Sequence, residues 1–461
     1  MNETGMLEIL RKQREFFSSH ATLSRPFRLE MLGKLKSALL ESEGAILAAL
    51  KTELGKHEIE AFESETGQLL FEINHAIRHL GKWMRPEKVP TPLFHLPGRS
   101  EIIPEPYGVT LIIAPWNFPL QLLLVPLVGA ICGGNTAILK PSSKTPLTSR
   151  VIAEMIGQYF DPAYISVLAA GREEGDFLLG QKFDLIFFTG GTEAGKHVMA
   201  EASGNLTPVV LELGGKNPCL VDKSADIRTS ARRIVWGKFF NAGQDCIAPD
   251  YVYADKSIKD ALVREMKTAV REFYGEDPRA SASYGRIVTQ ERVEAMSALL
   301  GEGKIALGGT FDKESRYFSP TIIEGVDFGS KIMQGEIFGP ILAVLEFTDI
   351  AEAIRNINDR PKPLALYLFT RSGELRERVL RETSSGGVCV NDTLSHFTSR
   401  YLPFGGVGQS GMGQYHGKSS FDAFSHKKSV MRKSFLIDYA LRYPPYGRLT
   451  SWYRKLLEWT T

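Results

Sequence analysis

Residues 108–139 carry no charged side chain, and this stretch limits the possible folds more than any other part of the sequence. It is long enough to span a bilayer, but Pro115, Pro119 and Pro126 interrupt it. We therefore interpret its first part, GVTLIIAP, as a fully buried strand and the following PLQLLLVPLVGAIC as a buried helix. A strand without a polar face is typical of a parallel sheet that helices cover on both sides.

The alternation of strand and helix continues along the chain. Further strands are predicted at 136–140, 165–170, 183–190, 207–215, 217–222, 251–253, 340–347, 365–370 and 386–392. Helices are predicted at 146–160, 191–202, 232–240, 259–275, 350–357 and 374–381. Strands joined by crossover helices form parallel sheets. The predicted fold class is therefore α/β, with two doubly wound, Rossmann-like domains that bind ligands at the carboxyl ends of their strands.

Two segments near the N-terminus do not follow this alternation. Residues 1–84 have apolar side chains at helical spacing, for example at Met31, Leu35 and Leu39. Residues 85–104 are rich in proline and predict a hairpin arm that leaves the domain and reaches a partner. With 461 residues the chain is too long for one hydrophobic core, so we expect two or three domains.

The composition excludes several classes of function. The net charge of +2 comes from 55 basic and 53 acidic residues, so nucleic acid is not an expected partner. The four cysteines have no paired spacing and no histidine at ligand spacing, which indicates a reduced, cytoplasmic protein without a metal site. Glu3 and Glu8, with no long apolar run near them, argue against a signal peptide.

Cys246 is the first candidate for chemistry. It lies in the segment NAGQDCIAPD, between a helical pattern and the short strand pattern at 251–253. At such a junction the sulfur can be exposed, with backbone N–H groups nearby that stabilise a thiolate or an oxyanion. The alternative is a small buried side chain, because free cysteine is among the most buried residue types.

Two further residues are candidates for the same site. Glu212 ends a predicted strand among apolar neighbours, which suits a base of raised pKa, although a solvated acid at the strand end is the alternative. Asn117 lies between two prolines that restrict the backbone, so its amide is either a positioned hydrogen-bond donor or part of an ordinary turn.

The segment GGTEAGKH at 190–197 resembles a phosphate-binding loop. His197 stands where such a loop needs serine or threonine to hold Mg²⁺, which disfavours an ATPase. A glycine-rich turn at a helix N-terminus still offers N–H groups to a phosphate. The sequence has no GxGxxG motif, so a dinucleotide would be bound without it.

Taken together, these motifs resemble the NAD(P)-dependent aldehyde dehydrogenases. The family's order is followed by PWNFP, LKPS, FTGGTEAG, LELGGKNP, GQDC, EIFGP, VND and PFGGVGQSG, which span about 115–411. The short N-terminus, APDY after the cysteine and RYPPY near the end are similar to the class 3 branch. That resemblance implies oxidation of medium- to long-chain aliphatic or aromatic aldehydes to carboxylic acids.

The resemblance also implies a role for each candidate. Cys246 matches the nucleophile that forms a thiohemiacetal and then a thioester, Glu212 the base that activates water, and Asn117 the oxyanion donor. The residues matching cofactor contacts are Trp116, Lys140, Ser143, Gly190, Gly191, Thr192, Gly195, Leu213, Glu336 and Phe338.

Two of these positions depart from the family's usual pattern. Gly191 stands where many members have a polar side chain, which leaves only backbone donors for the pyrophosphate. Ser143 stands where members that prefer NAD often have glutamate, so we expect NADP to be accepted alongside NAD.

The family's organisation implies domain boundaries and a homodimer. We expect a cofactor-binding domain at 1–84 and 105–209 and a catalytic domain at 210–412. A bridging arm for oligomerisation is expected at 85–104 and 413–435, and a tail at 436–461. Two alternatives remain: a catalytically idle member used as a binding or structural protein, and an enzyme that passes its acyl group to coenzyme A. Cys246, Glu212 and Asn117 argue against the first alternative, and Glu212 argues against the second.

The sequence pattern of the tail predicts one more helix. Within 449–459, apolar residues recur at helical spacing, at Leu449, Trp452, Tyr453, Leu456 and Leu457. A helix this short is marginal in water, so we expect its apolar face to be buried on the protein or on a dimer partner. The alternatives are a cap on the aldehyde tunnel that favours long substrates, and weak contact with a membrane surface.

Overall fold

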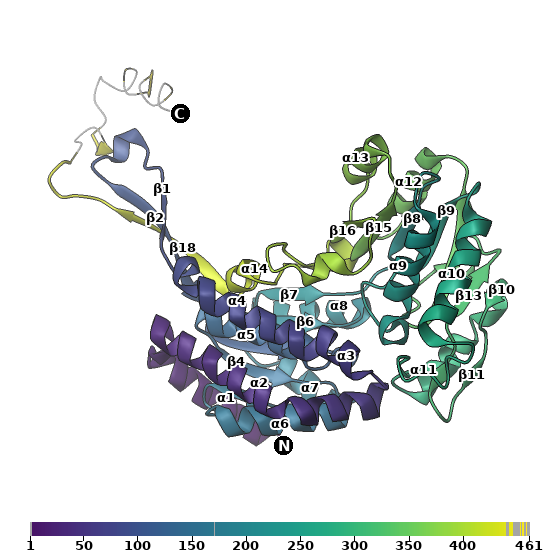
Figure 1. The fold of residues 1–461 in the computed structure, drawn as a ribbon. Helices are drawn as coiled ribbons and strands as arrows, with labels where there is room; N and C mark the ends of the chain where they lie inside the picture. The colour runs from purple at the N-terminus through teal and green to yellow at the C-terminus, as the bar shows by residue number, and fades with distance from the viewer. Residues whose placement is uncertain are drawn as a thin grey trace.

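A computed structural model describes residues 2–169, 171–438, 442–445, 452, 454–455 and 458 of the protein. Two α/β bodies lie side by side, and a narrow arm projects from one of them (Figure 1). The first body is built on a six-stranded sheet and the second on a seven-stranded sheet, while the arm is a three-stranded sheet. The predicted α/β class, with parallel sheets and Rossmann-like units, is confirmed.

The six-stranded sheet has the order β17-β7-β6-β3-β4-β5. Its strands are β3 (Val109–Ile113), β4 (Thr136–Lys140), β5 (Ile165–Val167), β6 (Leu185–Thr189), β7 (Val209–Glu212) and β17 (Gly411–Met412). All pairs are parallel except β17 with β7. The chain runs outward from β3 to β5 and then returns to the other side of β3 with β6. This reversal between β3 and β6 is where doubly wound sheets open a crevice for ligands.

Helices cover both faces of this sheet, as the uncharged stretch predicts. The α-helices of this body are α1 (Glu3–Ser18), α2 (Arg25–Leu54), α3 (Glu58–Ala61), α4 (Gly67–Trp83), α5 (Gln121–Gly133), α6 (Pro146–Tyr159), α7 (Arg172–Leu179) and α8 (Thr192–Ser203). Every residue of α5 is buried. Leu111 belongs to one apolar cluster and Ile112 to the other, because successive side chains of a strand point to opposite faces.

The seven-stranded sheet has the order β10-β13-β14-β9-β8-β15-β16. Its strands are β8 (Pro218–Val221), β9 (Tyr251–Asp255), β10 (Lys304–Leu307), β13 (Thr321–Glu324), β14 (Ile341–Phe347), β15 (Ala365–Phe369) and β16 (Gly387–Val390). Only the β10–β13 pair is antiparallel. The α-helices of this part are α9 (Ile227–Phe239), α10 (Lys259–Tyr274), α11 (Gln290–Ser297), α12 (Ile350–Asn358) and α13 (Gly373–Glu382).

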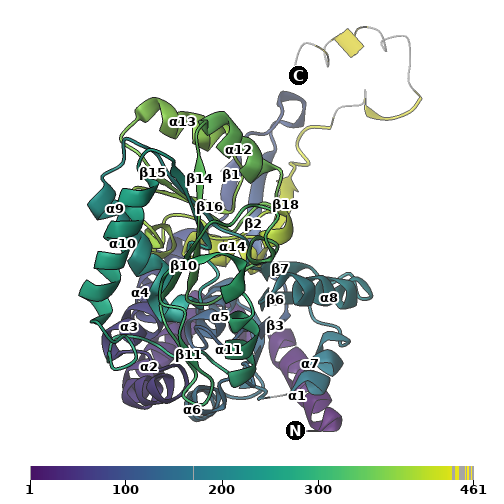
Figure 2. The same ribbon diagram turned by 90° about the vertical axis from the view of Figure 1, so that its right-hand side faces the viewer.

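The arm contains the predicted hairpin and one strand from much later in the chain. Strands β1 (Glu87–Val89) and β2 (Arg99–Pro106) pair antiparallel, and β18 (Ser425–Arg432) pairs with β2 along its whole length. Helix α14 (Lys418–Ala423) leads into β18. Figure 1 shows the arm extending away from the two bodies, and in the turned view of Figure 2 its strands overlap the second body. Leu93 and Leu96 near its tip are exposed.

Two segments of the sequence bear on membrane contact, the uncharged stretch and the tail. The uncharged stretch 108–139 forms β3, α5 and most of β4 in the core of the first body. No helix in the described ranges combines the length and hydropathy needed to cross a bilayer. Leu449, Tyr453, Leu456 and Leu457, which carry most of the predicted apolar face of the tail, lie outside the described residues, so that helix stays a prediction.

Candidate active site

Three cavities lie near the carboxyl ends of the strands of the first sheet. The polar cavity, of about 320 Å³, is lined by Asn117, Glu212, Cys246, Glu336 and Phe338 among others. The apolar cavity, of about 580 Å³, is lined by Cys246 and by aromatic side chains that include Phe62, Phe71, Phe118, Trp236, Phe240 and Phe397. The outer cavity, of about 540 Å³, includes Lys140, Ser143 and His197.

Cys246 lines both the polar and the apolar cavity. The structure therefore brings the three candidates for chemistry into one place, although they are distant in sequence. Asn117 follows β3, Glu212 is the last residue of β7, and Cys246 follows the short helix η4 (Phe240–Gly243). A residue at the wall between two cavities is accessible to a ligand in either of them.

An unusual backbone presents Cys246. Asn241 and Ala242 have positive φ angles of 49° and 51°, and Gly243 follows at 73°. Such conformations are costly for residues other than glycine and are found where the surroundings enforce them. Gln244 supplies much of this restraint, because its amide donates to Asn241 O and Arg286 O and accepts from Val288 N–H.

The surroundings of the sulfur disfavour its ionised form. Burial raises the pKa of the Cys246 thiol well above its usual range, and the carboxyls of Asp245 and Glu336 raise it further. The backbone around the cysteine is held independently, since Asn217 Nδ2 donates to Cys246 O at 2.7 Å. The thiol of the protein alone is therefore neutral near pH 7.

Glu212 is a buried carboxyl with only 3% of its surface exposed. Among the described residues, neither of its side-chain oxygens has a hydrogen-bond partner. Burial alone raises the pKa of Glu212 well above its ordinary value. The backbone at this position is fixed by Gly190 N–H, which donates to Glu212 O, and by pairing with β17. A carboxyl with unoccupied oxygens at a cavity wall is available to a water or a substrate.

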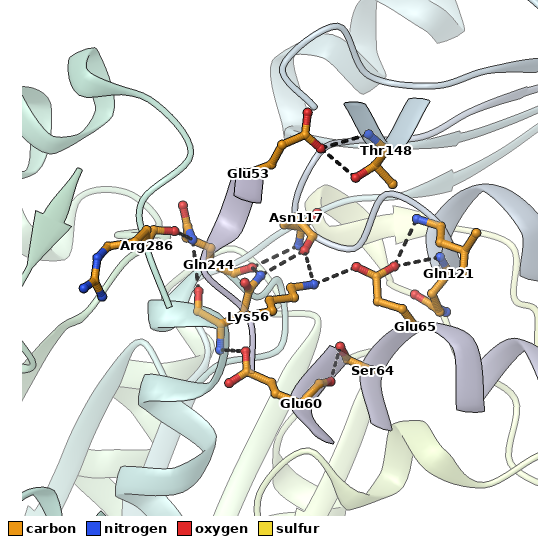
Figure 3. Close-up of polar contacts among 12 residues, drawn as sticks. Glu53, Lys56, Glu60, Ser64, Glu65, Asn117, Gln121, Thr148, Gln244 and Arg286 are labelled. Atoms are coloured by element: carbon orange, nitrogen blue, oxygen red, sulfur yellow. Dashed lines mark hydrogen bonds and ion pairs between the residues drawn. The ribbon is translucent and has the colours of Figure 1, made fainter. Parts of the chain in front are cut away.

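Asn117 is held by both its main chain and its side chain (Figure 3). Its Nδ2 donates to Gln244 O at 3.1 Å, and its carbonyl accepts from Lys56 Nζ and from Asn241 Nδ2, each at 2.9 Å. An amide nitrogen carries two hydrogens. One bond to Gln244 therefore leaves a second N–H to serve a ligand in the polar cavity.

The expected cofactor residues fall into groups. Trp116, Gly190, Gly191, Glu336 and Phe338 line the polar cavity. Lys140 and Ser143 line the outer cavity. Thr192 lies in the first turn of α8 and donates its hydroxyl to Gln409 O, while Gly195 in that helix packs against Leu213.

The polar cavity has features that fit a dinucleotide. Glu336 Oε1 is buried and lacks a hydrogen-bond partner in the described part of the chain, and burial raises the pKa of this carboxyl to about 8. Helix α8 starts directly after Gly191, where a Cβ would meet no atom within 4 Å. Trp116 and Phe338 pack edge to face, with ring centroids 5.3 Å apart. Acceptors for ribose hydroxyls, N–H donors for phosphate and aromatic surface are thus present together.

Sequence reasoning missed several residues of this site. Asp245 is 6% exposed and lines the apolar cavity, and burial raises its pKa to about 6. Its place next to Cys246 in the sequence is the signal that points to it. The aromatic walls of the apolar cavity come from distant segments, and no local pattern connects them. The described ranges contain no group of three or more His, Cys, Asp or Glu placed to hold a metal ion.

Comparisons with known proteins agree with this geometry. A model described as the aldehyde dehydrogenase family matches residues 2–430. The chain is 47% identical over 433 residues to the 4,4'-diaponeurosporen-aldehyde dehydrogenase of Staphylococcus aureus, covering 94% of each protein. It is 45% identical over 442 residues to mouse aldehyde dehydrogenase family 3 member A2, covering 95% of this chain and 91% of the relative.

The same similarity holds in three dimensions. The solved structure described as the substrate-bound state of Staphylococcus aureus AldH superimposes with a TM-score of 0.96 at 45% identity, covering 99% of this chain and all of that one. The fold and the matches define an oxidoreductase of α/β architecture. The chain belongs to the aldehyde dehydrogenase family, and its relatives include family 3 members, which confirms the class 3 resemblance.

The burial of Glu212 predicts a dependence of stability on pH. Because its pKa is raised in the folded protein, the folded state holds the proton more tightly than the unfolded chain does. The contribution of Glu212 to the free energy of unfolding is complete below the unfolded pKa of about 4.3 and is lost as pH rises through the folded pKa. Glu212→Gln stays neutral at every pH.

We therefore expect the Tm of Glu212→Gln, relative to wild type, to increase as pH is raised from about 5 to about 9. Scanning calorimetry at matched ionic strength measures this difference, and the exposed Glu201→Gln serves as the control. A Tm difference that is the same at both pH values would mean that folding does not perturb Glu212.

Proposed function

We propose that this protein oxidises apolar aldehydes to carboxylic acids with NAD(P)⁺, and that Cys246 is the nucleophile. The observation that carries the proposal is the position of Cys246 in the wall between an apolar and a polar cavity, beside Glu212 and Asn117. An aldehyde entering from the apolar side and a dinucleotide on the polar side would then meet at the sulfur.

The first step requires the Cys246 thiol, which is neutral in the protein alone, to lose its proton to solvent. The resulting thiolate then adds to the aldehyde carbon. The carbonyl oxygen becomes an oxyanion, and two donors are available to it: the second N–H of the Asn117 amide and the backbone N–H of Cys246. Because Gln244 O already accepts one hydrogen of Asn117 Nδ2, the direction of the other is set before substrate arrives. Donors fixed in advance stabilise charge without reorganising.

The oxidation then leaves a thioester on Cys246. When bound, NAD(P)⁺ supplies the acceptor for the hydride that leaves the aldehyde carbon. Glu336, Phe338 and Trp116 would hold its nicotinamide end in the polar cavity, and the N-terminus of α8 its phosphates. Lys140 and Ser143 would contact the adenosine side from the outer cavity.

Hydrolysis of the thioester needs a base, and Glu212 suits that role. In its ionised form the carboxylate takes a proton from water, which attacks the thioester carbon and releases the carboxylic acid from Cys246. The raised pKa makes Glu212 a stronger base than an exposed carboxylate. Its presence favours release to water over transfer to coenzyme A, and the complete triad of residues argues against an idle family member.

The apolar cavity indicates the class of aldehyde. Its aromatic walls favour a hydrocarbon chain, since each buried methylene contributes about 0.8 kcal/mol. The name of the Staphylococcus aureus relative also refers to an aldehyde as substrate. We propose medium- to long-chain aliphatic or aromatic aldehydes.

For the oligomeric assembly and the domain boundaries we propose the arrangement expected for the family. We propose a cytoplasmic homodimer in which the arm at 85–104 and 413–435 contacts the second subunit, supported by its projecting position and its exposed leucines. The cofactor-binding domain would comprise 1–84 and 105–209 and the catalytic domain 210–412. The tail at 436–461 would influence substrate choice through its helix.

The first prediction concerns the nucleophile. Cys246→Ala removes the sulfur that adds to the aldehyde, so we expect aldehyde oxidation to fall by at least about a hundredfold. Cys132→Ala, Cys219→Ala and Cys389→Ala are the controls; these buried cysteines should retain most of the turnover. Reduced cofactor is followed by absorbance. More than a few per cent of wild-type kcat in Cys246→Ala would contradict the assignment.

The second prediction separates oxidation from hydrolysis. Glu212→Gln cannot accept a proton from water, so thioester hydrolysis should slow more than the oxidation that precedes it. Rapid mixing is then expected to show a burst of reduced cofactor close to one equivalent of enzyme, followed by a slow steady state. Steady-state turnover equal to that of the wild type would exclude Glu212 as the base.

The third prediction concerns the choice between NAD and NADP. The outer cavity is lined by two acidic side chains, Asp176 and Glu193, as well as by Lys140 and His197. Ser143 adds no further negative charge, so position 143 itself does not repel a 2′-phosphate. We expect both cofactors to be used, and Ser143→Glu to lower kcat/KM for NADP more than for NAD. Ser143→Ala is the matched control. A wild-type kcat/KM for NADP more than about a thousandfold below that for NAD, or about 4 kcal/mol, would contradict the prediction.

A further inference from the structure

We propose that the buried ion pair between Lys56 and Glu65 positions the oxyanion donor Asn117 and the adjoining wall of the apolar cavity. The inference rests on the proposed function of Asn117 and adds two positioning residues to it. Neither side chain lines the polar cavity, so both would act through the segment 117–121.

The pair is fully buried. Lys56 Nζ lies 2.7 Å from Glu65 Oε1, and both side chains have 0% of their surface exposed. Lys56 follows α2, and Glu65 lies in the π-helical turn η2 (Phe62–Thr66). π-Helical turns are rare and are frequent at functional sites. Burying two charges carries a desolvation penalty, and a hydrophobic pair of similar volume often stabilises the folded state as well or better. Stability alone is therefore a weak explanation for an ion pair at this position.

Lys56 contacts two successive residues of the active site. Its ammonium donates to Asn117 O at 2.9 Å and lies 4.2 Å from the centroid of the Phe118 ring. The Phe118 ring lines the apolar cavity. One cation therefore holds the carbonyl of the proposed oxyanion donor and the ring that would contact the substrate.

Glu65 holds the other end of the same segment. Its Oε2 accepts the N–H groups of Leu120 and Gln121, each at 3.0 Å (Figure 3). These N–H groups belong to the start of α5, and Leu120 before the helix is apolar and cannot cap it. The carboxylate thus caps α5 through its negative charge and fixes where the loop from β3 ends.

The cysteine segment completes the arrangement from the opposite side. Asn241 Nδ2 donates to both Asn117 O and Gln244 O, and Asn117 Nδ2 donates to Gln244 O. Lys56 and Asn241 thus both donate to the main-chain carbonyl of Asn117. These two bonds fix the orientation of Asn117 relative to the segment that carries Cys246. A displacement of about 1 Å in a catalytic group is enough to cost about a hundredfold in rate.

The test uses a reaction that needs no cofactor. Attack of the Cys246 thiolate on p-nitrophenyl acetate forms an acetyl thioester and expels p-nitrophenolate, and the carbonyl passes through an oxyanion at the same place. We expect Lys56→Met to slow this acylation about 10- to 100-fold and to lower kcat for aldehyde oxidation, with the KM for NAD(P)⁺ within about twofold of wild type. Glu65→Gln, which keeps its shape and loses its charge, should act in the same direction.

Glu53→Gln is the matched control. Glu53 is also a buried carboxylate of the N-terminal helices, and it caps α6 by accepting from Leu147 N–H at 2.6 Å and Thr148 N–H at 3.0 Å. Figure 3 shows its contact with Thr148. In the described part of the chain its carboxylate bonds to Leu147 and Thr148 and not to the 117–121 segment, so its loss should lower Tm without slowing acylation. Melting curves of all variants separate a loss of folded protein from a loss of rate, and Glu65→Gln carries the test if Lys56→Met does not fold.

A double mutant distinguishes positioning from a general structural effect. If Lys56 acts through Asn117, Lys56→Met should change acylation less than about twofold in an Asn117→Ala background. Two outcomes would overturn this inference without affecting the proposed function. One is a wild-type acylation rate in both Lys56→Met and Glu65→Gln. The other is a rate in the double mutant that equals the product of the two separate losses from Lys56→Met and Asn117→Ala. If Asn117→Ala or Cys246→Ala itself acylates at the wild-type rate, the proposed function fails and the inference fails with it.

Discussion

The parallel pairing of β3 with β6 is the constraint on which the rest of the site depends. Their register, from Thr110 opposite Leu185 to Ile113 opposite Phe188, aligns the carboxyl ends of two strands whose connections then diverge. Asn117 follows one strand and Gly190 the other, while β7 beside β6 ends at Glu212. The crevice needs no special motif, because it results from the reversal of winding direction in a parallel sheet.

Desolvation controls the protonation of the acidic groups in this crevice. Burial is the largest cause of the raised pKa of Cys246, Glu212 and Asp245. Burial therefore disfavours the ionised form of each of these groups, and a cation that enters the crevice favours it. Cys246 and Asp245 line the apolar cavity, so the aromatic side chains that would bind an apolar substrate also surround these two groups.

The N-terminal helices contribute more than cover for the sheet. Gln13 in α1 donates to Ala137 O of β4, Glu53 caps α6, and Glu65 caps α5. Lys56 extends this series to Asn117 itself. Polar side chains from one helical segment thus satisfy main-chain groups of the sheet connections, which would otherwise be buried without partners. The loops of the candidate site are in this way held by side chains that precede the first strand.

Local pattern in the sequence determined the fold class, the succession of most strands and helices, and the motifs around Cys246, Glu212 and Asn117. These follow from short-range physics, since apolar periodicity, prolines and glycines act within a few residues. Only the tertiary structure decided the antiparallel register of β18 on β2 in the arm, that Phe62 and Phe397 line one cavity, and that Lys56 contacts Asn117. Such contacts join segments tens to hundreds of residues apart, and they depend on how the sheets pack, which no local spacing encodes.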